Sequence, residues 1–162
     1  MSRHHERGQI AFLFAFMLFW LALATALAVD GGYALFQERQ SQNAVDLGAT
    51  TAAELLQFTC TGAGNSPTGT TIVETINTTV AANTTDGQPS TTWVGSYLNS
   101  TSQYLAGITS ASNPPSGACE IKLQLTSQWH TNLLSLIGMP HLATTVNAIA
   151  TYSTSGSGEL LT

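Results

Sequence analysis

The residues with the clearest capacity for chemistry are the chain's two cysteines, Cys60 and Cys119. Cysteines in an oxidising compartment most often pair, and a bridge that closes so long a loop would stabilise the folded chain by about 4 kcal/mol. Two free, buried cysteines are the alternative. No second Cys or His pair has the spacing of zinc ligands, so the cysteines predict a disulfide and no metal site.

Three asparagines each begin an N-x-[ST] sequence, the acceptor pattern for N-linked glycans in exported proteins: Asn77, Asn83 and Asn99. In a chain rich in threonine and asparagine the same pattern also arises by chance. These residues are therefore predicted as potential glycosylation sites, with ordinary surface asparagines as the alternative.

The remaining reactive side chains form no catalytic constellation. His130 and His141 stand apart in the sequence and belong to no nucleophile motif, and a G-x-S-x-G motif is absent. Carboxylates are scattered along the chain, at Glu74, Asp86, Glu120 and Glu159. Because catalysis needs a nucleophile, a base and a group that orients the base, we expect neither an enzyme nor a cofactor.

Aromatic and aliphatic residues between residues 93 and 108 recur at helical spacing, as on one stripe of a helix: Trp93, Tyr97, Tyr104, Leu105 and Ile108. A stripe of this kind most often packs into a core. The alternative is a membrane-tethered binding module, in which Trp93, Tyr97 and Tyr104 contact a carbohydrate or a surface partner.

All these residues must be positioned by a chain whose dominant element is the uncharged apolar stretch from Gln9 to Val29. A helix needs about 20 residues to span a bilayer, and this stretch has that length. A cleaved secretory signal is the alternative, because an A-x-A pattern occurs at residues 24–26 and 26–28, but the apolar region of such a signal spans only about 7–15 residues. We predict a retained helix that is covered by lipid or by sister helices.

Composition and charge favour a protein of the cell envelope. Only 8% of the residues are charged, against about 25% in a typical soluble domain. Arg3 and Arg7 precede the apolar stretch and Asp30 follows it, so the positive-inside rule places residues 1–8 in the cytoplasm and the later residues outside. The net charge of −5 argues against nucleic-acid binding. Asp30 is expected to be the first solvated residue, with a functional charge at the membrane boundary as the alternative.

Small residues recur at helical spacing towards the end of the apolar stretch: Ala22, Ala24, Ala26, Ala28 and Gly32. Rows of small residues let helix backbones approach closely, so they predict a helix-packing face, with plain lipid contact as the alternative. Gly31 and Gly32 each lower helix propensity by about 1 kcal/mol relative to alanine. We therefore predict a hinge at these two glycines.

Beyond the apolar stretch, helical spacing continues without a proline, which predicts one long helix over residues 9–58. Residues 9–29 would form the anchor and residues 30–58 an extracellular stalk. An extracellular head over residues 59–153 and a flexible tail over residues 154–162 would follow.

Within the head, residues 70–82 have the spacing of a short helix, although their threonines also permit a strand. Residues 120–129 and residues 142–153 alternate between apolar and polar side chains, which predicts two half-buried strands that pair with each other. Residues 130–138 predict a short helix between them. The predicted fold class is α+β: a long transmembrane, pilin-like helix followed by a small extracellular α+β head with an antiparallel or mixed sheet.

Three motifs lie around the apolar stretch: RGQ at residues 7–9, VDGGY at residues 29–33 and QSQNAVDLGA at residues 40–49. Together they resemble the TadE/TadG-like proteins of tight-adherence (Flp) pilus systems. The segment VNAIAT at residues 146–151 is similar to the outer domain of that family. The resemblance implies a structural protein whose partners are membrane lipid and other copies of itself or other pilus subunits.

One position departs from the pattern of type IV prepilins, which keep a glutamate shortly after the glycine where the leader is cut. Counted from Gly8, the corresponding position is Leu13. The resemblance therefore fits the TadG-like branch, whose N-terminal anchor is uncleaved.

The sequence thus predicts a structural envelope protein of a tight-adherence-type pilus, held in the cell membrane by a single pass with its head outside. The first alternative is that the chain itself polymerises as the main subunit of an extracellular filament. The second is the membrane-tethered binding module.

Overall fold

The computed structural model describes residues 6–62, 65–84, 90–131 and 133–152. The predicted tail lies outside these residues. The chain divides into two compact units, which we call the anchor unit and the head unit. The anchor unit comprises Met1–Phe36 and His130–Leu142, and the head unit comprises Gln37–Trp129 and Ala143–Thr162.

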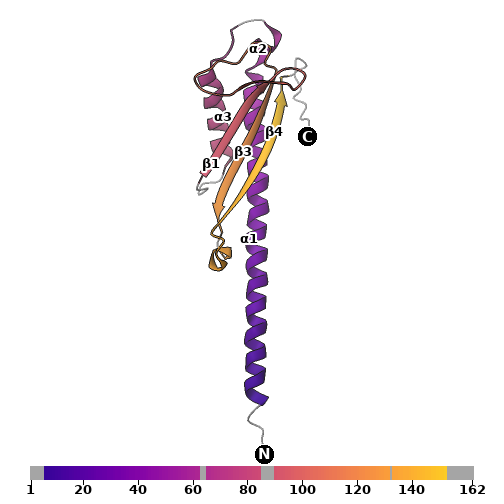
Figure 1. Cartoon of the computed structure of the whole chain (residues 1–162), viewed down its shortest axis with the longest axis vertical. Coiled ribbons are helices and arrows are strands. Elements are labelled where there is room, and N and C mark those ends of the chain that lie inside the picture. The colour runs from indigo at the N-terminus through magenta and orange to yellow at the C-terminus, as the bar shows by residue number, and fades with distance from the viewer. Residues whose placement is uncertain (1–5, 63–64, 85–89, 132, 153–162) are drawn as a thin grey trace, which may run out of the picture. The chain divides into compact units, whose positions relative to one another are not determined.

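The longest element is the helix α1, Glu6–Glu54, which contributes to both units (Figure 1). The predicted helix is correct in type, but it begins before Gln9 and does not reach Phe58. The backbone N–H groups of Leu55 and Leu56 donate to carbonyls three residues back, at 3.2 and 3.0 Å. This tighter 3₁₀-type pattern ends the α-helix, and a separate short helix α2, Gln57–Thr61, follows.

The head unit contains a four-stranded antiparallel sheet in the order β2-β1-β3-β4. Figure 1 labels β1, β3 and β4. The strands are β1 Ser90–Leu98, β2 Tyr104–Gly107, β3 Glu120–His130 and β4 His141–Thr151. The two predicted strands are confirmed as β3 and β4, which are hydrogen-bonded neighbours. Alternation in β3 buries Ile121, Leu123 and Leu125 and exposes Lys122 and Gln124.

The predicted helical stripe from Trp93 to Ile108 is wrong, because this segment forms the hairpin of β1 and β2. The side-chain oxygen of Asn99 accepts the backbone N–H groups of Thr101 and Gln103, at 3.0 and 2.9 Å. Asparagine favours such turns because its side chain replaces a backbone acceptor. The turn adds residues between β1 and β2, so the sequence intervals between apolar residues on either side of it resemble the spacing along one face of a helix.

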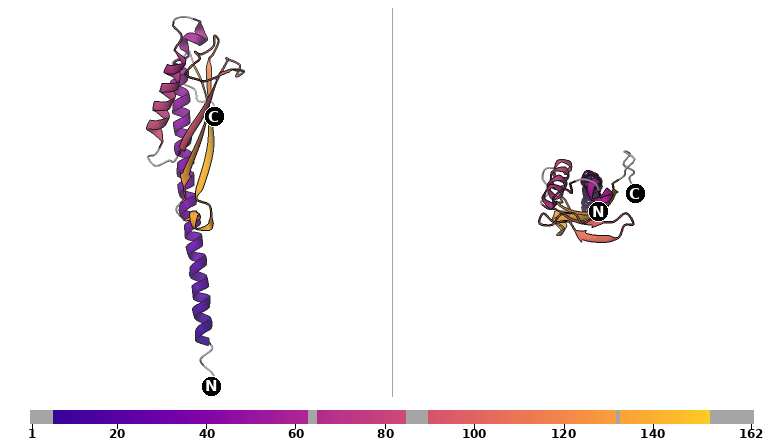
Figure 2. Two further views of the ribbon diagram at one scale, coloured as in Figure 1. Left: turned by 60° about the vertical axis from the view of Figure 1, so that its left-hand side comes forward. Right: turned by 90° about the horizontal axis from the view of Figure 1, so that it is seen from above.

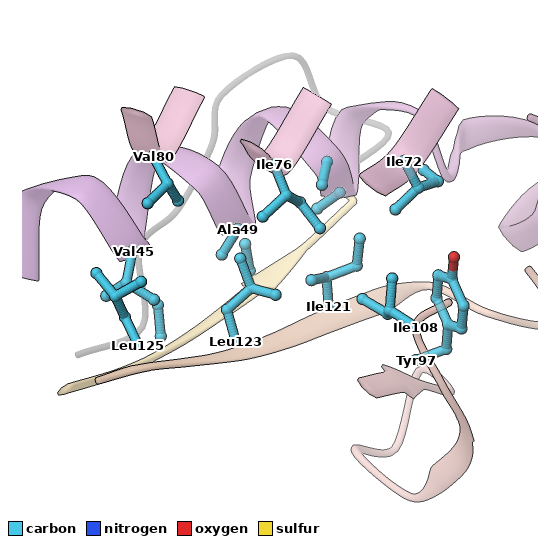
Figure 3. Close-up of a cluster of buried hydrophobic side chains, with 14 of the residues drawn as sticks. Val45, Ala49, Ile72, Ile76, Val80, Tyr97, Ile108, Ile121, Leu123 and Leu125 are labelled. Carbon is cyan, nitrogen blue, oxygen red and sulfur yellow. The ribbon is translucent and has the colours of Figure 1, made fainter. Parts of the chain in front are cut away.

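The helix α3, Gly69–Asn83, confirms the helical prediction over its strand alternative. The Thr68 side chain caps its first turn by accepting the backbone N–H of Thr71 at 3.2 Å. Ile72, Ile76 and Val80 recur every four residues on the buried face of α3 (Figure 3). Four-residue spacing lines one side of a helix, and that side faces the sheet.

The segment between β3 and β4 is less helical than predicted for residues 130–138. His130 still belongs to β3, and only Leu134–Ile137 form a single 3₁₀ turn, η1. The predicted end at Gly138 is confirmed: this residue adopts a φ of 89°, which glycine tolerates without a Cβ penalty.

The core of the head unit lies between the sheet and two helices, α3 and the later part of α1 (Figures 2 and 3). From α1 it takes small side chains, including the fully buried Ala44, Ala49 and Ala52. A Cβ at Gly48 would lie 3.2 Å from Val80 of α3. The small residues of α1 thus allow α3 to pack closely, and residues 37–54 belong to the same compact unit as the sheet.

The predicted disulfide between Cys60 and Cys119 is present and links α2 to the residue that precedes β3. Hydrogen bonds reinforce the link: the Thr59 hydroxyl donates to the Ala118 carbonyl at 2.9 Å, and the Gly117 N–H donates to the Thr59 carbonyl at 3.1 Å. The bridge therefore connects the end of the helical segment to the central strand of the core.

Leu123→Ala tests the packing of the core. Leu123 is fully buried, so its truncation should lower the free energy of unfolding by about 2–5 kcal/mol. Chemical denaturation of the detergent-solubilised full chain measures the change. Val94→Ala is the matched control, because Val94 is exposed on the same sheet. Equal losses for the two variants would contradict the described core.

Replacing both Cys60 and Cys119 by serine tests the contribution of the bridge. The cross-link closes a separation of 59 residues, and its loss should cost about 4 kcal/mol of unfolding free energy. Denaturation with and without a reductant provides the comparison. The reductant should destabilise the native chain and leave the double variant unchanged; a native chain insensitive to reduction would refute the prediction.

Candidate membrane anchor and binding surfaces

The most prominent functional surface is the apolar part of α1 in the anchor unit. Its large side chains are exposed all round the helix; Phe12 and Met17, for example, are 71% and 74% exposed. No described residue of the chain covers the most apolar window of this helix. Since water solvates such a surface unfavourably, the segment has the length and composition of a membrane span.

The predicted packing residues form two rows on this helix. Ala22 and Ala26 make one row, and Ala24, Ala28 and Gly32 make the other. A helix turns by about 100° per residue, so the two rows face nearly opposite sides. The second row is exposed along its length. Its packing against another helix stays a prediction.

The predicted hinge glycines, Gly31 and Gly32, lie within the continuous helix α1. A Cβ placed on either glycine would meet no atom within 4 Å. Neither residue is therefore explained by a close approach to the described parts of the chain. Their role as a hinge stays a prediction.

Asp30 is buried rather than solvated, which corrects the expectation from the sequence. Its side chain is 2% exposed. One carboxylate oxygen, Oδ2, accepts the backbone N–H groups of Leu133 and Leu134, at 3.0 and 2.7 Å. All three residues belong to the anchor unit. The carboxylate thus caps the start of η1. The bonded residues are 103 and 104 positions apart in the sequence, so no local sequence pattern signals this contact.

The two histidines that stand apart in the sequence meet in the anchor unit. The ring centroids of His130 and His141 lie 4.2 Å apart, at the ends of β3 and β4. Both side chains are exposed. Among the described residues, no group of three or more His, Cys, Asp or Glu side chains is arranged to hold a metal ion.

The three aromatic residues of the predicted binding patch do not form one platform. Tyr97 is fully buried beside Ile108 in the core (Figure 3), whereas Tyr104 is 67% exposed. Trp93 packs partly against the core, and its indole N–H donates to Asn77 Oδ1 at 2.8 Å. Burial raises the pKa of Tyr97 to about 12. The patch is therefore not assembled as predicted.

A shallow hollow of about 380 Å³ lies on the outer face of the sheet. Its lining includes Tyr104, Lys122 and Ile149, from three strands. The lining combines one cation with polar and apolar side chains, which suits a weak surface contact rather than a buried ligand. Sequence reasoning missed this surface because its residues become neighbours only through strand order.

The asparagines of the three N-x-[ST] sequences all have side-chain hydrogen bonds. Asn77 accepts the indole N–H of Trp93, Asn83 donates to the Thr79 carbonyl at 2.8 Å, and Asn99 organises the β1–β2 turn. Asn77 is exposed, and Asn83 and Asn99 are half-buried. Glycosylation at these residues stays a prediction.

Tyr97→Phe tests the buried hydroxyl, which has no hydrogen-bond partner among the described residues. Removing it should raise the free energy of unfolding by about 1 kcal/mol, because an unsatisfied buried polar group is lost. Ionisation of Tyr97 does not affect the free energy of unfolding below about pH 10, the pKa of an unfolded tyrosine. As the pH rises from there towards the folded pKa of about 12, the native chain should lose stability, because the hydroxyl ionises more readily in the unfolded chain. The variant should lack this alkaline loss.

Tyr104→Phe is the control for that measurement, because Tyr104 is exposed and its replacement should leave stability unchanged. Denaturation curves at neutral and alkaline pH compare the two variants. A loss of stability in Tyr97→Phe that exceeds the loss in Tyr104→Phe would show that the hydroxyl is satisfied.

Comparison with known proteins bears on the N-terminal segment. Comparison with the curated proteins and with the solved structures gives no match. Residues 8–54, which cover the apolar span, the buried Asp30 and most of the rest of α1, match the family model described as putative Flp pilus-assembly TadE/G-like. The resemblance inferred from the motifs is thus confirmed over this segment, which is similar to the TadE/G-like Flp pilus-assembly family.

Proposed function

We propose that this chain is a non-catalytic structural protein of the cell envelope that serves a tight-adherence-type pilus. The observation that carries the proposal is the family match over residues 8–54. It coincides with the helix whose apolar side chains the described chain leaves uncovered. The family supplies the pilus context, and the helix supplies the means of attachment.

In this proposal, α1 anchors the chain in the membrane by a single pass, and the head lies outside the cell. Arg3 and Arg7 precede the apolar span, and positively charged flanks favour the cytoplasmic side. A disulfide between Cys60 and Cys119 supports an oxidising compartment for the head. Charge asymmetry and redox chemistry thus favour the same orientation.

A second candidate is that the chain polymerises as the main filament subunit. The observation that favours it is the all-round exposure of the apolar helix, which sister helices could cover as well as lipid does. The open row of Ala24, Ala28 and Gly32 would allow close approach between copies. Purified filaments decide between the candidates through the identity of their dominant polypeptide.

A deletion strain complemented with variants of the anchor tests the proposal. Phe16→Arg combined with Phe19→Arg adds roughly 6 kcal/mol to the insertion cost of the span, at about 3 kcal/mol for each central charge. The variant should be absent from the carbonate-resistant membrane fraction. It should also fail to restore surface filaments, as seen by negative-stain microscopy.

The matched control carries the same charge on the head, as Leu47→Arg combined with Phe58→Arg, because both residues are exposed there and lie outside the hollow on the sheet. This control should remain in the membrane fraction and restore filaments. Unchanged filaments in the deletion strain itself would overturn the pilus role. Membrane retention of the anchor variant would overturn anchoring by this helix.

A further inference from the structure

We propose that the described part of the segment between β3 and β4, Thr131 and residues 133–140, is a second membrane contact: an apolar loop that Asp30 holds at the lipid surface beside the anchor helix. We call it the lipid loop. The inference rests on the proposed membrane anchoring by α1. It concerns contacts within the anchor unit alone, because Asp30 and the loop both belong to it.

The position of Asp30 supplies the first step of the argument. Asp30 directly follows Val29, the last residue of the apolar run, and Val29 is 52% exposed. If the run spans the bilayer, Asp30 lies where hydrocarbon gives way to headgroups. The hydrogen bonds from Leu133 and Leu134 to its carboxylate, at 3.0 and 2.7 Å, place the start of the loop at the same level.

The side chains of the loop supply the second step. Residues 131–140 read TNLLSLIGMP and contain no charged residue. Leu136 is 83% exposed and Met139 is 55% exposed. Large apolar side chains so fully uncovered on a short turn favour transfer out of water. At the level of Asp30, the apolar environment within reach is the lipid around α1.

The backbone of the loop supplies the third step, because polar groups that enter lipid must be satisfied internally. The N–H groups of Leu136, Gly138 and Met139 donate to carbonyls within the loop, at 3.1, 3.2 and 3.1 Å. The N–H of Thr131 donates to the Pro140 carbonyl at 3.1 Å. Together with the Asp30 cap, these bonds reduce the cost of burying the loop in the interface.

The choice of lipid over a protein partner follows from charge and continuity. The loop offers no charged side chain with which to select a partner surface, and it is tied to the residue that ends the lipid-covered helix. The exposed rings of His130 and His141 lie next to each other at the two ends of the loop. Polar groups are therefore present where β3 ends and β4 begins.

The test uses the full chain in vesicles of phosphatidylethanolamine and phosphatidylglycerol. Leu136→Cys introduces a unique thiol, since both native cysteines are in the disulfide, and it is labelled with an environment-sensitive NBD probe. Val29→Cys reports the anchor helix. Val94→Cys is the matched control, an exposed apolar residue of the head. Doxyl lipids quench probes in the bilayer, and iodide quenches probes in water.

We expect the Leu136 probe to be blue-shifted, protected from iodide and quenched by a doxyl group near the headgroups, as the Val29 probe should be. The Val94 probe should respond to iodide alone. Lipid quenching at Val29 without quenching at Leu136 overturns the lipid loop and leaves the anchor intact. Absence of lipid quenching at Val29 overturns the proposed anchoring, and the lipid loop with it. Protection of the Leu136 probe from both quenchers would show that protein, and not lipid, covers the loop, and would overturn the lipid assignment.

The role of Asp30 is tested in the same vesicles with Asp30→Leu and Asp30→Asn. Leucine removes the acceptor, so the lipid quenching of the Leu136 probe should fall while that of the Val29 probe is unchanged. Asparagine keeps one acceptor oxygen without the charge, so it should retain part of the quenching. Full quenching at Leu136 in the Asp30→Leu chain overturns the claim that Asp30 holds the loop at the surface.

Discussion

The incompatibility of the first half of α1 with water is the constraint on which the rest of this structure depends. Over residues 10–29 the helix exposes phenylalanine, leucine and methionine side chains on all sides, and no described residue covers them in the most apolar window. Burial of apolar surface is the main favourable term in folding and association. A surface that the chain does not bury must be covered by lipid or by other helices. The segment with this requirement is also the segment that the family model matches, residues 8–54.

The later part of α1 meets a different requirement. Its alanines and Gly48 pack against α3 and the sheet, so one continuous helix serves as an uncovered apolar rod in the anchor unit and as a core element in the head unit. The disulfide from Cys60 to Cys119 then joins the short helix after α1 to the start of β3. The head unit is therefore stabilised by apolar packing and by a covalent bond that limits its unfolded states.

Burial of Asp30 adds a long-range polar contact to the anchor unit. A carboxylate that is 2% exposed is costly unless it is hydrogen-bonded, and the N–H groups of Leu133 and Leu134 provide such bonds. The contact thus orders the start of the loop between β3 and β4.

Local patterns in the sequence determined the elements that depend on neighbours within a few residues. The uncharged run predicted the span, alternation predicted β3 and β4, and four-residue spacing predicted α3, because each pattern reflects one buried face of one element. The spacing from Trp93 to Ile108 was misleading because it spans two strands: the turn at Asn99 separates them by a number of residues that reproduces helical spacing.

Only the tertiary structure decided which distant residues meet. The cap of η1 by Asp30, the adjacent rings of His130 and His141 and the burial of Tyr97 all depend on strand order and on how the chain returns to α1. The sequence by itself determined that an apolar rod precedes a cross-linked α+β head. Partners far apart along the chain leave no periodic signal, so the folded arrangement alone selects them.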